Sequence, residues 1–144
     1  MASTTPSILI VEDEFGLAEM LREMLRDCGY EVTLAINGRL ALEILGERNV
    51  DLVLTDMMMP VMDGAELATV MRNHDRYRAT PIIMMTSLPA AVPQAGSLFD
   101  AVLPKPFTPE LLLKTIARCL AAADRDVSGP GARQKPESDA GAAG

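Results

Sequence analysis

The stretch VDLVLTDMMMPVMDG, residues 50–64, contains a short apolar run, a threonine and an acidic residue, followed by a loop rich in methionine. The run 52–54 contains no polar residue, which is typical of a strand buried on both faces. Asp56 follows this strand, and Asp63 with Glu66 has the spacing of a helix-capping box. The stretch therefore predicts a buried strand, an acidic residue at its carboxyl end, and a helix after a loop.

An acidic pair closes an earlier strand of the same kind. The apolar run 8–11 is followed at once by Glu12 and Asp13. Apolar residues then recur at three- and four-residue steps over 17–28, and Gly29 stands where a helix C-cap is expected. This part of the chain predicts a second strand that ends in carboxylates and leads into an amphipathic helix.

Polar residues also follow two later strands. The run 81–85 ends at Thr86, and the short run 101–103 leads into the Pro-Lys-Pro segment that contains Lys105. With a further strand at 31–35, five strands alternate with helical patterns, which predicts an α/β fold with a parallel sheet covered on both faces. Ligands of such sheets bind beyond the carboxyl ends of the strands, so we expect these polar residues to converge at one edge.

The helical pattern is weakest before the last strand. Residues 88–99 contain two prolines and a glycine, so the fourth helix is expected to be short or irregular. Thr108 and Pro109 then have the residue types of an N-cap and a first helical position, which predicts that a last helix begins there.

Composition limits the class of function. The chain has 144 residues and a formal net charge of −7, which suits one domain and argues against a nucleic-acid-binding surface. We expect a flexible N-terminus over 1–7, one domain over 8–123, and a disordered tail without an effector domain over 124–144. No signal peptide or membrane-spanning segment is recognised, so the default location is cytoplasmic. Cys28 and Cys119 lie in phase with apolar helical positions and are predicted to be buried.

The residues expected at the carboxyl edge suit metal-assisted phosphoryl transfer. Glu12, Asp13 and Asp56 can all stay ionised at close range only if a cation joins them. An all-oxygen ligand set favours a hard divalent ion, Mg²⁺ or alternatively Mn²⁺. Lys105 adds a positive charge and Thr86 a hydroxyl donor, which together provide an anion site beside the metal. A carboxylate in such a site can act as the nucleophile and form an aspartyl phosphate.

Four segments give the sequence a family resemblance. ILIVEDE, VDLVLTDMMMPVMDG, IIMMTS and LPKPF are similar, in this order, to the successive signatures of response-regulator receiver domains, and the resemblance covers residues 8–122. It implies a flavodoxin-like three-layer sandwich, in which five helices flank a five-stranded parallel sheet of strand order 2-1-3-4-5. It also implies a response regulator of a two-component system or phosphorelay. A sensor histidine kinase or a histidine phosphotransfer protein would phosphorylate it, and phosphorylation would switch its protein contacts.

The resemblance also assigns metal ligands. It implies that Asp56 is the phosphoacceptor and that Asp13 binds Mg²⁺ directly, with Glu12 assisting through water. Asp56 and the backbone carbonyl of Met58 would complete the ligands that the protein supplies. The same resemblance implies that Gly64 closes the loop after the phosphoacceptor strand.

Further residues are implied at the phosphoryl group, and one family feature is missing. Lys105 would pair with the phosphoryl group, Thr86 would bind a phosphoryl oxygen, and the Lys105-Pro106 peptide bond is expected to be cis. Many receiver domains carry an aromatic residue three positions before this lysine. Here that position is Val102, and Phe99 is out of register. The usual coupling between the threonine and an aromatic ring is therefore not expected in this chain.

Other classes of protein are alternatives to the receiver-domain interpretation. The resemblance implies a signalling phosphoacceptor rather than an enzyme, with at most slow autodephosphorylation. It also implies a monomer or a weak phosphorylation-dependent dimer that binds neither nucleic acid nor membrane. A pseudo-receiver would keep the fold and act only through protein contacts. A haloacid-dehalogenase-like phosphatase would need a second aspartate two residues after the nucleophile, where this chain has Met58. A flavodoxin-like redox protein would need a phosphate-binding loop rich in serine and threonine after the first strand, where this chain has the acidic residues 12–14.

Overall fold

The structure, a computed structural model, describes residues 5–89 and 98–128 of the chain. Strands and helices alternate, and their bounds in chain order are β1 (Ser7–Val11), α1 (Phe15–Asp27), β2 (Glu31–Ala35), α2 (Gly38–Glu47), β3 (Leu52–Asp56), α3 (Gly64–Arg72), β4 (Ile82–Thr86), β5 (Ala101–Pro104) and α4 (Pro109–Ser128). The described residues thus hold four helices where five were expected. The missing one was expected within 88–99, of which residues 90–97 lie outside the described part of the chain.

The five strands form one parallel sheet in the order β2-β1-β3-β4-β5, as the sequence predicts. The register aligns the carboxyl ends of the central strands, because Val11 lies opposite Thr55, Asp56 opposite Met85, and Thr86 opposite Pro104. Residues that follow these positions therefore emerge at the same edge of the sheet.

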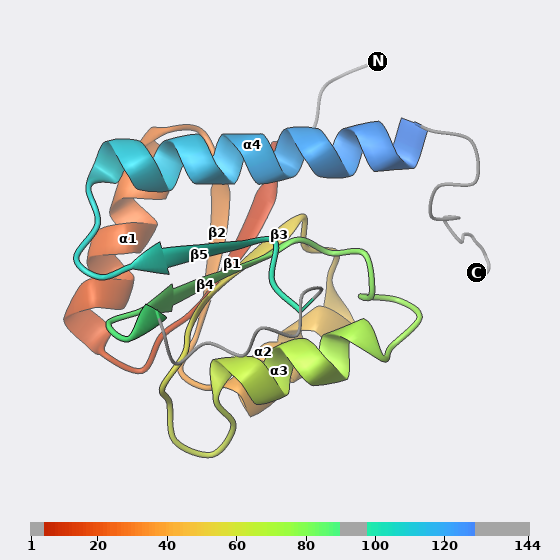
Figure 1. Cartoon of the computed structure of the whole chain (residues 1–144), viewed down its shortest axis with the longest axis horizontal. Coiled ribbons are helices and arrows are strands. Elements are labelled where there is room, and N and C mark those ends of the chain that lie inside the picture. Colours follow the sequence, from red (N-terminus) through yellow and green to blue (C-terminus); the bar gives the residue numbers. More distant parts are fainter. Residues whose placement is uncertain (1–4, 90–97, 129–144) are drawn as a thin grey trace.

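Helices cover both faces of the sheet, with α1 and α4 on one side and α2 and α3 on the other (Figure 1). Successive residues of β1 point to opposite faces, so Ile8 and Ile10 pack toward α1 and α4, whereas Leu9 and Val11 pack toward α2 and α3. All four are fully buried, and each such side chain contributes about 1.5–3 kcal/mol relative to an exposed one. Burial on both faces explains why the central strands β1, β3 and β4 are nearly continuous apolar runs, whereas β2 at the sheet edge is only partly buried and contains polar residues.

Local capping signals in the sequence set the helix ends. Asp63 and Glu66 form the predicted capping box of α3, since each side chain accepts a hydrogen bond from the other residue's backbone N–H. The Thr108 hydroxyl accepts a hydrogen bond at the start of α4, as predicted. Gly29 has a φ of 95° just beyond the end of α1, which is the left-handed conformation that favours glycine there.

Arg72 joins the starts of the two outermost strands on one side of the sheet. From the end of α3, its guanidinium donates to the carbonyls of Leu98 and Thr80 and to the Asp100 carboxylate, which lies 2.9 Å from it. The same carboxylate accepts a hydrogen bond from the Ile82 N–H at 2.8 Å. These bonds fix where β5 begins relative to β4, and hence where the residue after β5 emerges. The sequence analysis did not foresee this role for Arg72.

The ends of α1 and α4 differ from what the sequence predicts. The prediction that Cys28 is buried was wrong, because α1 ends at Asp27 and the exposed Cys28 lies past the periodic part of the helix; Cys119 is buried as predicted. The last helix, α4, extends to Ser128, beyond the expected domain limit at residue 123, and the alanines at 121–123 favour this extension. Among the described residues, no helix is both long and apolar enough to cross a membrane.

Candidate functional site

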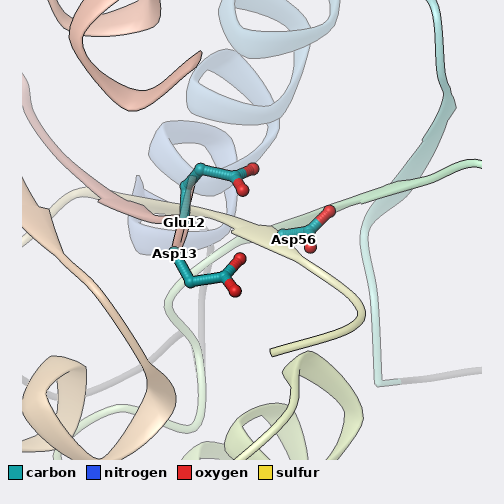
Figure 2. A group of neighbouring side chains, drawn as sticks. All are labelled: Glu12, Asp13 and Asp56. Atoms are coloured by element: carbon teal, nitrogen blue, oxygen red, sulfur yellow. The ribbon is translucent and has the colours of Figure 1, made fainter. Parts of the chain in front are cut away.

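Three carboxylates lie together at the carboxyl edge of the sheet. Glu12 and Asp13 follow β1, and Asp56 ends the neighbouring strand β3 (Figure 2). One oxygen of each carboxylate lies within 4.8 Å of the others. Glu12 is 2% exposed and Asp56 is 7% exposed, whereas Asp13 is open to solvent. The convergence that the strand order predicts is therefore present, with two acids buried and one at the opening.

Lys105 faces two of these carboxylates. Its Nζ lies 2.7 Å from Asp56 Oδ1 and 3.6 Å from Glu12 Oε1. Its backbone N–H donates to the Thr86 carbonyl at 2.7 Å, which holds the segment after β5 against the end of β4. The Lys105-Pro106 peptide bond is cis, as expected. Burial alone lowers the pKa of the Lys105 ammonium, but the hydrogen bond to Asp56 and its charge, with that of Glu12, outweigh burial and raise the pKa.

Glu12 has an unusual environment for a carboxylate. Its Oε2 accepts a hydrogen bond from the Glu14 N–H at 3.1 Å, but its buried Oε1 has no hydrogen-bond partner. Burial raises the pKa of Glu12, and the charge of Asp56 raises it further, against the opposing effects of the Glu14 N–H and of Lys105. A buried carboxylate oxygen without a hydrogen bond is a free ligand position, so these residues fit a divalent cation.

Thr86 lies where the sequence places it, at the buried end of β4. Its Oγ1 accepts a hydrogen bond from the Leu88 N–H at 2.9 Å, which fixes the hydroxyl oxygen beside the backbone that follows the strand. The strand partner of β4 is β3, whose last residue is Asp56, so the hydroxyl belongs to the same edge as the carboxylates. It is a hydrogen-bond donor available to a ligand at that edge.

The loop between β3 and α3 borders the acidic group. It contains Met58, whose side chain is exposed and whose carbonyl role stays a prediction. Gly64 ends the loop: its N–H donates to the Met57 carbonyl at 2.9 Å, and a Cβ on it would lie 2.5 Å from the Asp56 carbonyl oxygen. Glycine is therefore required at this position for the close approach of the chain to the strand that carries Asp56.

Similarity to known proteins agrees with this geometry. Residues 8–117 match the response regulator receiver domain family. The chain belongs to this family. The residues that match the receiver domain family include the acidic group, Thr86 and Lys105.

Three relatives illustrate what this receiver domain is similar to. A response regulator receiver protein of Anaeromyxobacter sp. is 45% identical over 101 residues, which cover 68% of this chain and 42% of the relative. The chemotaxis response regulator CheY4 of Vibrio cholerae has a TM-score of 0.75 at 35% identity and covers 81% of this chain and 99% of that one. The response regulator TrrA of Thermotoga maritima, solved in complex with Mg²⁺-BeF, has a TM-score of 0.73 at 31% identity, with coverages of 80% and 99%. The chain spans about half the length of the curated relatives it matches first.

The start of α2 in this receiver domain was not predicted from the sequence. By sequence alone, the pair Asn37-Gly38 is typical of a turn. In the structure, Asn37 instead caps α2, and Gly38 is its first, buried residue, packed against Met62 of the β3-α3 loop. On the other side of the site, Val102 is partly exposed on β5 and Phe99 packs into the core beside α2 and α3. No aromatic ring thus occupies the position that many receiver domains use.

Proposed function

We propose that this receiver domain accepts a phosphoryl group on Asp56, with Mg²⁺ bound beside it, from the phosphohistidine of a sensor kinase or a histidine phosphotransfer protein. The observation that carries the proposal is the environment of Asp56. A nearly buried carboxylate ends a central strand, two further carboxylates adjoin it, and the Lys105 ammonium lies 2.7 Å from it. This combination places a nucleophile, a cation site and an anion-binding charge at one point.

The residues present fit a magnesium ion. Asp13 and Asp56 would bind it directly, the Met58 carbonyl would add a third ligand, and Glu12 would assist through water; Mn²⁺ would use the same set. Support comes from the oxygen-only donors, from the Glu12 Oε1 that accepts no hydrogen bond, and from the similarity to TrrA with its Mg²⁺-BeF. The bound ion would supply positive charge that keeps the carboxylates ionised together and offsets charge on phosphoryl oxygens.

The transfer itself is a displacement at phosphorus. A carboxylate oxygen of Asp56 forms the new bond to phosphorus while the bond between phosphorus and the donor's imidazole nitrogen breaks. The nitrogen keeps the electron pair and takes up a proton. The Lys105 ammonium then pairs with a phosphoryl oxygen, and the Thr86 hydroxyl donates a hydrogen bond to another. The product is an aspartyl phosphate, which is the signalling state of a phosphoacceptor domain rather than an intermediate of enzymatic turnover.

Intact-mass spectrometry tests the proposal. The full chain is incubated with acetyl phosphate and Mg²⁺, beside an Asp56→Ala variant and a sample with EDTA. A matched control is Asp75→Ala, which removes an exposed carboxylate far from the site. We expect one phosphoryl group on the wild type and on Asp75→Ala, and none on Asp56→Ala or without metal. A wild-type chain that gains no phosphoryl group would reject the proposal and favour a pseudo-receiver.

A further inference from the structure

Gly38 lies closer to a neighbouring loop than any other residue type allows. It is the first residue of α2 and is buried against Met62. A Cβ at Gly38 would lie 2.8 Å from Met62 Cγ, 3.1 Å from Met62 Cβ and 3.0 Å from the Met62 carbonyl oxygen, whereas ordinary contacts begin at 3.4 Å. The Cγ can move by rotation of the side chain, but the Cβ and the carbonyl oxygen can move only together with the loop backbone.

The backbone conformation of Gly38 does not explain the glycine. Gly29 is the glycine with positive φ among the described residues, and Gly38 has no such angle. Alanine has the higher helix propensity, and Asn37 already caps the helix with its side chain. The Gly38 N–H donates to the Met62 carbonyl at 3.2 Å. The close approach to Met62 is therefore the physical reason for a glycine here.

The loop that Gly38 touches carries part of the candidate site. It begins directly after Asp56 and includes Met58, whose carbonyl is the proposed third metal ligand. Its first N–H, that of Met57, donates to the carbonyl of Met85 in β4 at 3.0 Å, which fixes the loop at the sheet. Contact with Gly38 fixes its other half.

Between these two attachments the loop is stiff. The pyrrolidine ring of Pro60 restricts its φ. Val61 has a φ of 73°, and the Met62 N–H donates to the Pro60 carbonyl at 2.8 Å, which closes a three-residue turn. A displacement of Met62 would therefore be transmitted toward Met58 rather than absorbed between them.

We propose that Gly38 is a positioning residue of the metal site: its contact with Met62 sets the position of the β3-α3 loop and so of the Met58 carbonyl. This inference rests on the proposed function. Restoring an ordinary contact between a Cβ at Gly38 and the Met62 carbonyl oxygen needs a loop shift of about 0.4 Å, the difference between 3.4 and 3.0 Å. Mg²⁺ binds oxygens at about 2.0–2.1 Å and tolerates deviations of only about 0.2 Å. The shift therefore suffices to misplace one ligand while the helix remains intact.

The test compares two alanine substitutions in α2. Gly38→Ala adds a Cβ against Met62, whereas the matched control Gly46→Ala adds one at an ordinary 3.6 Å from the Tyr77 hydroxyl. Both are titrated with MgCl₂ as full chains, and affinity is read from amide NMR shifts near the acidic group. Metal-free thermal unfolding is measured in parallel. We expect Gly38→Ala to weaken Mg²⁺ binding by about 10- to 100-fold, the range for residues that support metal ligands, and Gly46→Ala to match the wild type.

A substitution at Met62 separates positioning from a general packing defect. In the wild-type background, Met62→Ala should weaken Mg²⁺ binding, because the loop loses the part of the Met62 side chain beyond Cβ that packs on Gly38 and keeps only the Cβ and backbone contacts. In the Gly38→Ala background, the same substitution should recover part of the affinity, because it removes the Cγ at 2.8 Å. This reversal of sign is not expected if either residue only stabilises the fold. If Gly38→Ala does not fold, the effect of Met62→Ala alone decides.

Equal affinities of Gly38→Ala, Gly46→Ala and the wild type would overturn the inference but leave the proposed function standing. A wild-type chain without Mg²⁺-dependent shifts at Glu12, Asp13 and Asp56 would overturn both. An affinity that falls only in proportion to metal-free stability would reduce Gly38 to a packing residue and also overturn the inference.

Discussion

Replacing Lys105 by alanine is expected to destabilise the metal-free protein and to leave the Mg²⁺-bound protein nearly as stable as the wild type. In the metal-free protein, the Lys105 ammonium is the positive charge that faces Asp56 at 2.7 Å and Glu12 at 3.6 Å. Without it, three neighbouring carboxylates repel one another with no compensating charge. Bound Mg²⁺ restores that charge, so the two forms should respond differently.

The size of the effect follows from the geometry. At 2.7 Å and an effective dielectric constant of about 20, the attraction between Lys105 and Asp56 is about 6 kcal/mol before desolvation is subtracted. Exposed ion pairs retain about 0–1 kcal/mol, and breaking a buried pair costs about 3–5 kcal/mol. The Lys105 side chain is 23% exposed, which lies between these cases, so we expect a loss of about 2 kcal/mol.

The pH at which the ion pair stabilises the protein follows from the pKa of Lys105. The pKa of Lys105 is raised above its ordinary value of 10.5, so its stabilisation is fully present below that value and is lost as pH rises through the folded-state pKa. Near neutral pH the ammonium is charged in both the folded and the unfolded state. The ion pair therefore contributes in full under ordinary assay conditions.

Urea unfolding followed by far-ultraviolet circular dichroism measures the effect, since the chain has no tryptophan for fluorescence. Wild type, Lys105→Ala and a control, Lys114→Ala at an exposed position of α4, are compared in EDTA and in excess Mg²⁺. Because the wild type also gains the free energy of metal binding, equal stability in Mg²⁺ requires Lys105→Ala to bind the ion about 30-fold more tightly, which corresponds to about 2 kcal/mol. Equal destabilisation of Lys105→Ala with and without Mg²⁺ would refute the reasoning, because the ammonium would then act by packing rather than by charge.

Three further substitutions test the electrostatics and the loop. Because the pKa of Glu12 is raised, its ionised form opposes folding above pH 4.5. Metal-free Glu12→Gln should therefore be more stable than the wild type near neutral pH, and the gain should vanish below pH 4.5. A variant that is less stable than the wild type in urea titrations near neutral pH would contradict this. Gly64→Ala would place a Cβ 2.5 Å from the Asp56 carbonyl oxygen and should lower the free energy of unfolding by about 1–3 kcal/mol, so an unchanged urea midpoint would be the opposing result. Val61→Asn relieves a φ of 73° at a branched residue that is 73% exposed, and should raise the free energy of unfolding by about 1 kcal/mol; a loss of stability would show that the valine side chain makes a contact worth more than the strain.

The convergence of the candidate site residues could be predicted from the sequence, because the signals for strand ends are local and a parallel sheet brings these ends together. Short apolar runs identify strands, and each of Glu12, Asp13, Asp56 and Thr86 closes or follows one. Parallel strands bring these ends to one edge without further information. Lys105 follows the last strand in the same way, and the structure places it against Asp56.

Features that depend on contacts between distant elements could not be predicted. Nothing in the sequence near Gly38 indicates that Met62 lies against it, so the residue was interpreted as part of a turn. The bonds of Arg72 to the starts of β4 and β5 likewise depend on the folded arrangement. Cys28 is a different case: Gly29 already marked the end of α1, and the helical phase was extended one residue too far.

Borohydride reduction after phosphorylation shows whether Asp56 itself forms an acyl phosphate. Borohydride converts an aspartyl phosphate into homoserine, which peptide mass spectrometry locates. Homoserine is expected at position 56, and only in samples that received both phosphodonor and Mg²⁺. Homoserine at another aspartate, or a phosphoryl group that survives reduction on a serine, threonine or histidine, would contradict this expectation.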